Sequence, residues 1–469
     1  MIGKKQTKIV ATISDRRCDV DFIKSLYLEG MNVVRLNTAH QSTEDTNKVI
    51  ENVRKVSGDI AILIDTKGPE VRTAGIDGTI QVKEGDEIFI GEIPPGKSGF
   101  QTNYQHFVQD LPVDSQILID DGSVCLKVIN KSRHTLVCRV ENNGGIGNKK
   151  SVNVPGVHLN LPSLSEKDID YIHFAVKHDI DYIAHSFVRS REDVKAIQSI
   201  LDEHGSKVKI IAKIENREGV DNIKQILKAC AGVMIARGDL GIEIPAEEVP
   251  AIQKSIIKTC IKKAKPVITA TQMLHSMIEQ PRPTRAEVSD VANAIFDGTD
   301  AVMLSGETAY GKYPVEAVRL MAKIARKVET QKEKLADLPV FKSRNRVRNY
   351  LAKAAVSAAL ELPVTAMIID CDTGHSARVV SAYRGHIPIF AKAGDSRVVR
   401  ELSLSYGVYP SYMEMPETTD VMVQKSLESL LESGDIHMDE MVVILAGTPG
   451  NSEGSNFIEI NTVAKTLGK

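Results

Sequence analysis

The sequence predicts an α/β protein: a closed (β/α)8 barrel with a small all-β domain inserted after its third strand and a separate C-terminal α/β domain. Three observations support this. Short β-branched, apolar runs alternate with amphipathic helical segments. The alternation stops after Lys67, in a stretch rich in Gly, Asp and Val, and resumes near residue 161. Three runs precede the interruption and five follow it, and eight strands with helices behind them can close into a barrel.

The length agrees with several domains. A chain of 469 residues exceeds one ordinary domain and predicts two to three. We place the barrel in residues 1–67 and 161–330, the inserted β domain in 68–160 and the C-terminal α/β domain in 331–469. A doubly wound open sheet is the alternative to the barrel, but no GxGxxG motif follows the first strand.

Composition excludes several classes of function. Lys plus Arg (59) nearly balances Asp plus Glu (61), so neither a nucleic-acid-binding nor a polybasic membrane surface is expected. No stretch approaches ~18 uninterrupted apolar residues, and the N-terminus lacks the apolar core of a signal peptide. A cytoplasmic location is therefore expected. The 6 cysteines form no CxxC pair, which favours buried, reduced thiols over a metal site.

The elements follow in order along the chain. The first three strands are expected in TKIVATIS, MNVVRLN and DIAILIDTK. The inserted domain has alternating runs such as TIQVKEGDEIFIG, SQILIDDGSVCLKVIN and HTLVCRVENNG, separated by turn residues. A helix, LPSLSEKDIDYIHFAVKHDI, then begins at a cap provided by Ser163 or Ser165. The remaining five strands are expected in IDYIAHSF, KVKIIAKIEN, AGVMIARGDL, KPVITATQM and DAVMLSGET.

The composition of the sequence changes again near residue 331. QKEKLADLPVFKSRNRVRN is charged, contains proline and is typical of a linker or surface segment. LAKAAVSAALEL then predicts an Ala-rich helix, and AMIID, IPIFAKA and MVVILAG predict buried strands. This pattern indicates a separate α/β domain.

Charged residues end the two runs between Lys207 and Pro245. Residues two apart share a face of a strand, so Lys213 projects with Glu215, and Arg237 with Asp239. Buried charges need pairing or a metal, so we place these residues at the open ends of two neighbouring strands. A purely structural cluster of ion pairs is the alternative.

In such a barrel the active site lies at the C-terminal ends of the strands. Two acids on adjacent strands, Glu215 and Asp239, suit Mg²⁺, which a few carboxylates and substrate oxygens hold. Arg35 and Lys213 add fixed positive charge. A metal beside these two cations implies an anionic, phosphoryl-bearing substrate. The strand ends in order carry Arg35 and Asn37, Asp65 and Thr66, Ser186, Lys213 and Glu215, Gly238 and Asp239, Thr271, and Ser305 with Glu307.

Lys213 has two possible roles. A Schiff-base lysine must lose its proton, which desolvation or a nearby cation would favour. The acids Glu215 and Asp239 act in the opposite direction. We therefore favour an ammonium that stabilises developing negative charge.

Several long motifs resemble pyruvate kinases over essentially the whole chain: LIDTKGPEVRT, IAKIENREGVDN, MIARGDLGIEIP, VITATQML and PRPTRAEVSDVANAIFDGTDAVMLSGETAYGKYPVEAV. The resemblance implies transfer of a phosphoryl group from phosphoenolpyruvate to ADP, giving pyruvate and ATP in glycolysis. It also implies a homotetramer formed through barrel and C-terminal contacts.

The resemblance also implies roles for individual residues. Arg35 would contact the transferring phosphate and Lys213 would stabilise its charge. Thr271 would relay a proton to the enolate. The remaining substrate and divalent-metal assignments are Ser186 with the substrate, the backbone of Gly238 and Asp239 with Thr271 for the substrate carboxylate, and Glu215 with Asp239 for Mg²⁺ or Mn²⁺.

The nucleotide is expected to meet Arg72, Lys150 and His40. Lys150 belongs to the inserted domain and reaches the site only if that domain closes as a lid, which would also exclude water. An ordinary structural histidine is the alternative for His40, and a solvated lysine the alternative for Lys150.

Two departures from the family pattern concern the nucleotide and the monovalent cation. TISDRR stands where the family usually has TIGPAS, and RLNTAHQ places Ala39 where a serine supplies a K⁺ ligand. The other K⁺ ligands, Asn37, Asp65 and Thr66, are present. Relatives that dispense with K⁺ carry a lysine where this chain has Glu70, so we expect K⁺ dependence with weakened affinity.

The C-terminal domain offers a second anion site. The segment CDTGHSAR opens a helix, which places Thr373, His375 and Ser376 where a phosphate can dock. The family binds phosphorylated effectors there, together with a loop like AGTPGNSEGSN. Because Cys371 and Asp372 replace hydroxyl or basic residues, we expect a monophosphate effector or none, rather than fructose 1,6-bisphosphate. A plain helix cap is the alternative.

Two other functions compete with pyruvate kinase. A Mg²⁺-dependent carbon–carbon lyase on a related barrel would need no nucleotide-binding lid. A catalytically silent binding protein would not need the full set of metal and lysine residues.

Overall fold

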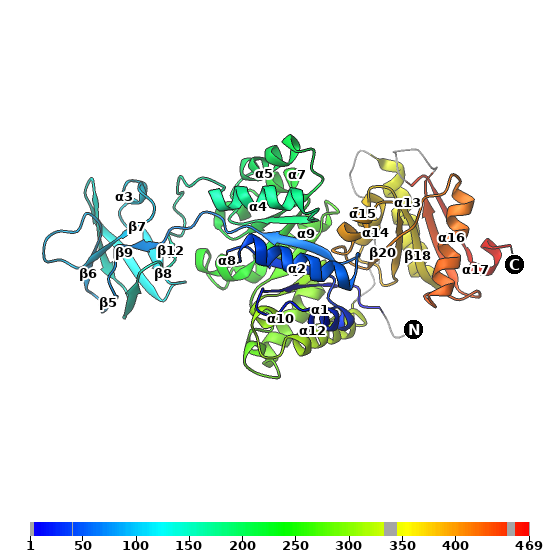
Figure 1. Ribbon diagram of the computed structural model, residues 1–469, viewed down its shortest axis with the longest axis horizontal. Coiled ribbons are helices and arrows are strands. Elements are labelled where there is room, and N and C mark those ends of the chain that lie inside the picture. The colour runs from blue at the N-terminus through cyan, green and yellow to red at the C-terminus, as the bar shows by residue number, and fades with distance from the viewer. Residues whose placement is uncertain (1–3, 40, 333–344, 448–454, 469) are drawn as a thin grey trace.

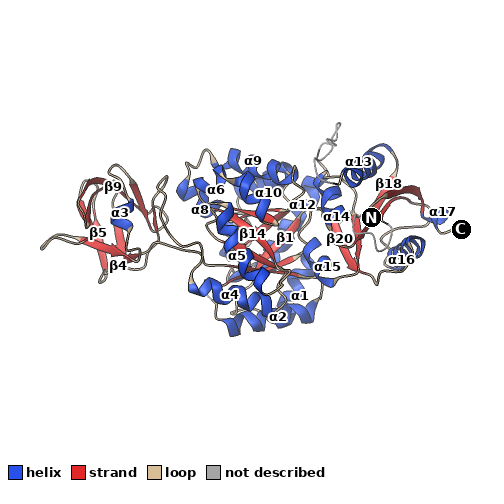
Figure 2. Ribbon diagram, turned by 90° about the horizontal axis from the view of Figure 1, so that it is seen from above, coloured by secondary structure: helices blue, strands red, loops and turns tan. Residues whose placement is uncertain are grey.

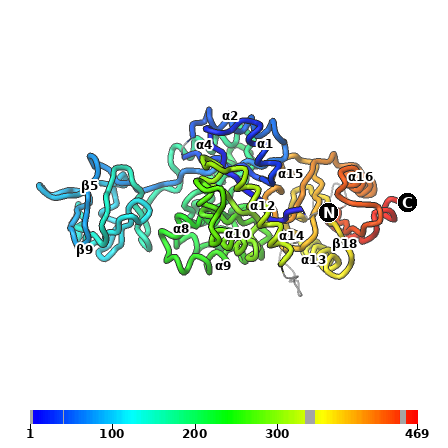
Figure 3. The backbone as a smooth tube through the Cα atoms, turned by 90° about the horizontal axis from the view of Figure 1, so that it is seen from below, coloured from blue at the N-terminus to red at the C-terminus, as the bar shows by residue number. Residues whose placement is uncertain are grey.

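The computed structural model describes residues 4–39, 41–332, 345–447 and 455–468. Three bodies lie in a row: the barrel in the middle, the inserted β domain at one end and the C-terminal domain at the other (Figure 1). Figure 3 follows the chain as it leaves the barrel for the inserted domain and returns. This architecture confirms the predicted fold class.

A closed barrel of eight parallel strands forms the centre, in the order β1-β17-β16-β15-β14-β13-β3-β2. β3 pairs directly with β13 across the inserted domain, which confirms three strands before the insertion and five after it. The strands are β1 (Lys8–Thr12), β2 (Val33–Asn37), β3 (Ala61–Asp65), β13 (Tyr182–His185), β14 (Lys209–Ile214), β15 (Gly232–Ala236), β16 (Val267–Ala270) and β17 (Ala301–Leu304).

Helices surround the barrel strands (Figure 2). Their apolar faces pack on the outer side of the strands and form the largest hydrophobic core. Ser165, one of the two predicted caps, begins α4 in a reciprocal capping box with Asp168. The helices are α1 (Val20–Glu29), α2 (Thr43–Val56), α4 (Glu166–Lys177), α5 (Arg191–Glu203), α6 (Arg217–Asp221), α7 (Ile223–Ala229), α8 (Arg237–Glu243), α9 (Val249–Ile261), η1 (His275–Ile278), α10 (Arg285–Asp297), α11 (Gly306–Ala309) and α12 (Pro314–Glu329).

The inserted domain has its own apolar core between strands that alternate in burial, as the sequence predicted. A seven-stranded sheet in the order β12-β8-β9-β10-β6-β7-β4 packs with the two-stranded sheet β11-β5. Its elements are β4 (Thr73–Ala74), β5 (Thr79–Val82), β6 (Glu87–Gly91), β7 (Gly99–Thr102), α3 (Phe107–Asp110), β8 (Gln116–Ile119), β9 (Val124–Lys131), β10 (Thr135–Val140), β11 (Gly144–Gly147) and β12 (Val152–Asn153).

The C-terminal domain is a five-stranded sheet in the order β20-β19-β18-β21-β22, with an apolar core on each face. The three predicted strands are β18, β19 and β21, and the predicted Ala-rich helix lies within α13. The elements are α13 (Arg346–Glu361), β18 (Val364–Cys371), α14 (His375–Ala382), β19 (Ile389–Ala393), α15 (Ser396–Leu402), β20 (Val408–Tyr412), α16 (Thr419–Glu432), β21 (Met441–Ala446), β22 (Phe457–Thr462) and α17 (Val463–Thr466).

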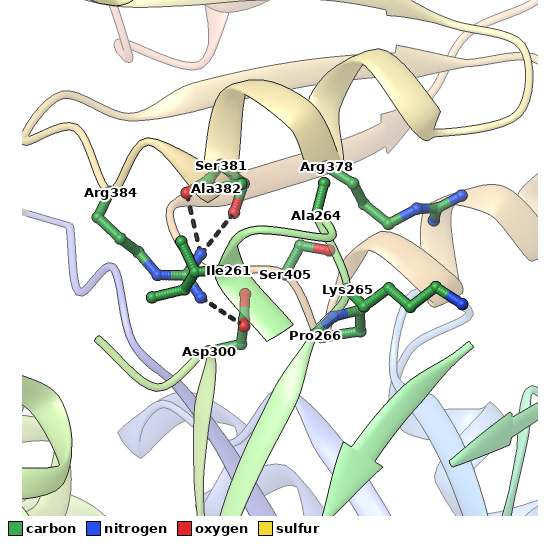
Figure 4. Close-up of a pocket in the computed structure, with 10 residues that line it drawn as sticks. All are labelled: Ile261, Ala264, Lys265, Pro266, Asp300, Arg378, Ser381, Ala382, Arg384 and Ser405. Carbon is green, nitrogen blue, oxygen red and sulfur yellow. Dashed lines mark hydrogen bonds and ion pairs between the residues drawn. The ribbon is translucent and has the colours of Figure 1, made fainter. Parts of the chain in front are cut away.

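The C-terminal domain is joined to the N-terminal end of the barrel by buried ion pairs. Arg384 donates to Asp300, at the start of β17, at 2.6 Å and to the Ser381 carbonyl at 2.9 Å (Figure 4). The cavity beside them holds about 10 Å³, room for one water. Leu404 packs inside the barrel floor. This junction is filled, so it leaves no room for a substrate.

The six cysteines are unbridged, and all but Cys125 are buried, as expected. Among the helices of the described residues, none combines the length and apolar character required to cross a membrane.

Candidate functional site

A lysine held between two carboxylates forms the base of the site. Lys213, near the end of β14, places Nζ 3.1 Å from Asp65 Oδ1 and 3.0 Å from Glu215 Oε1. Nζ also donates to Ser186 Oγ at 2.7 Å, and that hydroxyl donates onward to the Thr66 carbonyl at 2.6 Å. The predicted shared face of Lys213 and Glu215 is confirmed, and three neighbouring strand ends fix the position of the ammonium.

Arg35 brings a second cation to the same carboxylate. Its Nε donates to Asp65 Oδ2 at 2.7 Å, a second guanidinium nitrogen also contacts Oδ2, and Nη1 donates to Thr12 Oγ1 at 3.1 Å. Asp65 is 1% exposed, so it is a buried anion shared by two cations. The outcome is a site with fixed positive charge, which suits an anionic substrate.

The electrostatics keep Lys213 charged. Burial by itself would lower the pKa of Lys213, but Asp65 and Glu215 raise it above its ordinary value. Burial likewise opposes ionisation of Asp65, yet Lys213 and Arg35 lower its pKa overall. A protonated lysine cannot attack a carbonyl, so this environment favours the electrostatic role over a Schiff base.

Glu215 has features that suit a ligand of a cation. Burial, opposed by Lys213 but helped by the nearby negative charge of Asp239, raises the pKa of Glu215 to about 7. Oε2 accepts from the Phe187 amide at 2.7 Å, whereas Oε1 accepts no hydrogen bond from the described residues despite its proximity to Lys213. A metal ion at Oε1 would satisfy this buried oxygen.

The described residues alone do not complete a metal site. Within the described ranges, no group of three or more His, Cys, Asp or Glu side chains could hold a metal ion. Two carboxylates, Glu215 and Asp239, would therefore need oxygens from substrate or water, which is how Mg²⁺ is commonly held beside phosphates.

Thr271 lies in a strained loop after β16. Thr271 and Gln272 have φ of 66° and 57°, in the left-handed region that residues other than glycine rarely adopt. Thr271 Oγ1 accepts from the Gly238 amide at 2.8 Å and donates to the Ala270 carbonyl at 2.7 Å. These bonds bring Thr271 and Gly238 together, as predicted, but the Gly238 amide must exchange partners before it can meet a substrate.

Arg237 corrects one expectation. Instead of projecting into the site with Asp239, its guanidinium binds both carboxylate oxygens of Asp290 on α10, at 2.6 and 2.8 Å. It also donates to the Thr271 carbonyl at 2.7 Å. The physical reason is that α8 begins at Arg237, so the alternation of the strand ends at Ala236. Arg237 therefore supports the Thr271 loop.

A cleft of about 950 Å³ lies between the barrel and the inserted domain. Arg72, Lys150 and Asp239 all line it, so the predicted nucleotide residues share a cavity with a predicted metal ligand. Arg72 Nε is bonded to Glu70 at 2.8 Å, and Lys150 Nζ lies 2.8 Å from Asp120. His40 lies outside the described residues.

Comparison with known proteins decides the family. Residues 4–318 match the family described as "Pyruvate kinase, barrel domain", and residues 349–461 match "Pyruvate kinase, alpha/beta domain". The chain belongs to the pyruvate kinase family. Similar curated proteins include the pyruvate kinase of Borreliella burgdorferi, 53% identical over 470 residues, which cover 99% of this chain and 98% of the relative.

Two further relatives are the pyruvate kinases of Bacillus licheniformis and Geobacillus stearothermophilus, each 44% identical over 99% of this chain and 82% of the relative. Membership of the pyruvate kinase family makes the chain a phosphotransferase that moves the phosphoryl group of phosphoenolpyruvate to ADP in glycolysis. Pyruvate kinases need a divalent metal and, except for the relatives that dispense with it, K⁺.

The residues predicted for K⁺ lie at the end of β2 (Asn37), at the end of β3 (Asp65) and directly after β3 (Thr66). Asn37 Oδ1 accepts from the Ala39 amide at 3.2 Å, and Thr66 Oγ1 donates to the Ala184 carbonyl at 3.3 Å. Asp65 is already shared by Lys213 and Arg35. The neighbouring strands bring the three residues together, with Ala39 beside them.

The predicted effector residues surround the start of α14. Burial, with Arg348 and Arg378, lowers the pKa of His375 to about 4. Ser376 Oγ lies 2.9 Å from Ser455 Oγ, and both side chains are buried. The Thr373 carbonyl accepts from Arg378 at 2.7 Å. Most of the glycine-rich loop, residues 448–454, lies outside the described residues.

Sequence reasoning missed three contributors to the site. Asp290 orients Arg237, the Phe187 amide holds Glu215, and Asp120 pairs with Lys150. A positive φ of 55° at Phe187 directs its amide to the carboxylate, and no local pattern predicts this. The doubled acid of LIDDGS marks a polar turn, but no local pattern pairs Asp120 with Lys150, which lies 30 residues further along the chain.

Proposed function

We propose that Lys213 stabilises the phosphoryl group as it moves from phosphoenolpyruvate to ADP, with Arg35 binding the same group. The observation that supports this is the ammonium held 3.0–3.1 Å from two buried carboxylates at the C-terminal ends of the strands. A fixed ammonium in a water-poor site stabilises charge that develops on transfer, without reorganisation. Arg35 is anchored through Asp65 and can present its remaining donors to the phosphate.

Thr271, Gly238, Asp239 and Ser186 complete the proposed substrate site. The Gly238 and Asp239 backbone, with Thr271, receives the substrate carboxylate, and the Thr271 hydroxyl relays a proton to the enolate. The bond between the Gly238 amide and Thr271 Oγ1 supports their joint role. Ser186 is also a proposed substrate-binding residue, and the hydrogen bond that its hydroxyl accepts from Lys213 supports this.

Glu215 and Asp239 are the proposed ligands of Mg²⁺ or Mn²⁺. Oε1 of Glu215 is buried and paired with Lys213, but it accepts no hydrogen bond from the described residues. This and the raised pKa of Glu215 fit a divalent cation. Such an ion would neutralise negative charge that develops on the substrate during transfer. Glu215 would be held in place for it by the Phe187 amide.

Asn37, Asp65 and Thr66 are the proposed K⁺ ligands. Ala39 leaves one ligand position to water, so K⁺ affinity should be weaker than in relatives that have serine there. Relatives that dispense with K⁺ carry a lysine at the position of Glu70. Here the residue is an anion that pairs with Arg72 and Lys67, so this position supplies no cation in place of K⁺.

The inserted domain, residues 68–160, is the proposed lid over the nucleotide, with Arg72, Lys150 and His40 as ADP-binding residues. The shared cleft supports this for Arg72 and Lys150. Lys150 would exchange the Asp120 carboxylate for a nucleotide phosphate. Breaking the Lys150–Asp120 ion pair should cost little free energy, because both side chains are partly exposed.

The C-terminal domain, residues 331–469, is proposed to bind a monophosphate effector at Thr373, His375 and Ser376, or no effector, rather than fructose 1,6-bisphosphate. The nearby cations Arg348 and Arg378 support an anion there. Asp372 adds a carboxylate that disfavours a second phosphate. Strong activation on titration with fructose 1,6-bisphosphate would overturn this assignment.

We further propose a cytoplasmic homotetramer assembled through the barrel, residues 1–67 and 161–330, and the C-terminal domain. Exposed apolar side chains on α10 and α13, among them Phe296 and Tyr350, support contacts in both regions. Sedimentation that gave a stable monomer at working concentration would contradict the assembly.

One assay tests the reaction. Pyruvate formed from phosphoenolpyruvate, ADP and Mg²⁺ is read through NADH consumption by added lactate dehydrogenase. Turnover that requires both ADP and the metal is expected. Pyruvate release without ADP, or no release at all, would contradict the proposal.

A further inference from the structure

The two linkers of the inserted domain meet at one buried carboxylate. After β3, the Lys67 and Gly68 amides donate to Asp168 Oδ1 at 2.8 and 3.4 Å. On the return, the Ser165 amide and hydroxyl donate to Asp168 Oδ2 at 3.0 and 2.6 Å. Asp168 is 0% exposed. A single side chain therefore holds the chain where it leaves the barrel and where it re-enters.

Helix capping explains only half of these bonds. A capping box needs the N3 side chain to reach back to the N-cap residue, which Oδ2 does with Ser165. The bonds from Oδ1 go to amides about a hundred residues earlier in the chain. They add nothing to α4 itself, so they point to a role in joining the linkers.

The outgoing linker is fixed against the catalytic strand end. Gly68 has a φ of +73°, and a Cβ at this position would lie 2.8 Å from the Ser186 Cβ and 2.9 Å from the Phe187 ring. No larger residue fits without a shift. The linker thus lies against the residue whose hydroxyl accepts from Lys213.

The returning linker is held through its carbonyls. Arg189 donates to the Leu159 and Leu161 carbonyls at 3.1 Å each. His185 Nε2 lies 3.1 Å from the Ser163 carbonyl, and burial lowers the pKa of His185. Because a carbonyl only accepts, Nε2 carries the proton in this contact.

We propose that Asp168 is a positioning residue for phosphoryl transfer: it fixes the pivot of the inserted domain so that Arg72 and Lys150 close on the nucleotide in register with Lys213. This rests on the proposed lid. Transfer needs near-attack geometry, and a misplacement of about 1 Å costs roughly a hundredfold in rate. A small displacement at the linkers becomes a larger displacement at the far side of the cleft, where Arg72 and Lys150 meet the nucleotide.

The test compares Asp168→Asn with a matched control, Asp181→Asn. Both carboxylates are 0% exposed, but Asp181 lies at the opposite end of the barrel, where it accepts from Ile62 and Arg400. In Asp168→Asn the side-chain NH₂ group faces one pair of donors, so one linker is released. Both variants should unfold at a lower temperature than the wild type. Only Asp168→Asn should change the KM for ADP.

For Asp168→Asn we expect the KM for ADP to rise about fivefold and kcat to fall about tenfold. The calorimetric Kd of phosphoenolpyruvate with Mg²⁺ should change less than about twofold, because that site belongs to the barrel. Asp181→Asn should keep the wild-type ratio of the KM for ADP to the KM for phosphoenolpyruvate. A wild-type ratio in Asp168→Asn, or the same rise in both variants, would overturn the proposal.

A second variant covers misfolding. If Asp168→Asn is insoluble, Arg189→Gln releases two carbonyls of the returning linker from a partly exposed position and should raise the KM for ADP in the same way. An unchanged KM there contradicts the proposal. Small-angle scattering distinguishes the proposed lid from the proposed role of Asp168. If the radius of gyration of the wild-type protein does not fall when ADP, Mg²⁺ and oxalate are added, the inserted domain is not a lid. If the domain closes but the variants keep the wild-type ratio of the KM for ADP to the KM for phosphoenolpyruvate, only the positioning role of Asp168 is removed.

Discussion

Replacing Lys213 with Met is the most direct perturbation of the site. The substitution keeps much of the side-chain volume and removes one charge that lies 3.0–3.1 Å from two carboxylates. A unit charge about 4 Å from the migrating phosphoryl group contributes about 4 kcal/mol at an effective dielectric constant of about 20. At about 1.4 kcal/mol per factor of ten, kcat should fall about 10³-fold.

The coupled lactate dehydrogenase assay measures this loss, and calorimetry should show much smaller changes in phosphoenolpyruvate and metal binding. Lys209→Met is the matched control: it removes a lysine from the other end of the same strand, where Nζ lies 3.7 Å from Glu401. Its kcat should stay near the wild-type value. If Lys213→Met kept more than about a tenth of wild-type activity, the electrostatic role assigned to Lys213 would be wrong.

Three other predictions follow from contacts around the site. Asp290→Asn loosens Arg237 and the Thr271 loop, so kcat should fall about tenfold with little change in the KM for ADP, and a wild-type kcat would contradict the support role. Activity should be lost when tetramethylammonium is the only monovalent cation, and Ala39→Ser should lower the K⁺ concentration needed for half-maximal rate; full activity without K⁺ would refute this. Because the pKa of Glu215 is about 7, protons compete with the metal below that pH. Mn²⁺ affinity, titrated by electron paramagnetic resonance, should rise from pH 6 to 7 and level off above; a constant affinity would exclude this competition.

Much of the site was predictable because the barrel imposes a simple geometry. Eight β-rich runs place their C-terminal residues at one end, so Lys213, Glu215, Arg35 and Asp65 could be assigned to one place before their distances were known. The alternation of strand side chains was enough to pair Lys213 with Glu215.

The remaining details depend on where that alternation stops and on long-range partners. Arg237 turns away because a helix starts at that residue, and Asp290, which receives it, lies 53 residues further along the chain. Lys150 meets Asp120 through a turn with positive φ at Asp120. The edge strand β22 is mostly half-buried, so its sequence lacks the apolar run that marked the buried strands.

The pairing of β3 with β13 bears on the order in which the chain folds. Leu63 aligns with Tyr182, so barrel closure joins strands that the whole inserted domain separates. For a disordered loop of that length, closure costs about 2 kcal/mol more entropy than for a ten-residue loop. The inserted domain has its own core, and its two ends meet at Asp168. If it folds first, the long loop becomes a short one, and barrel closure should then follow rather than precede it.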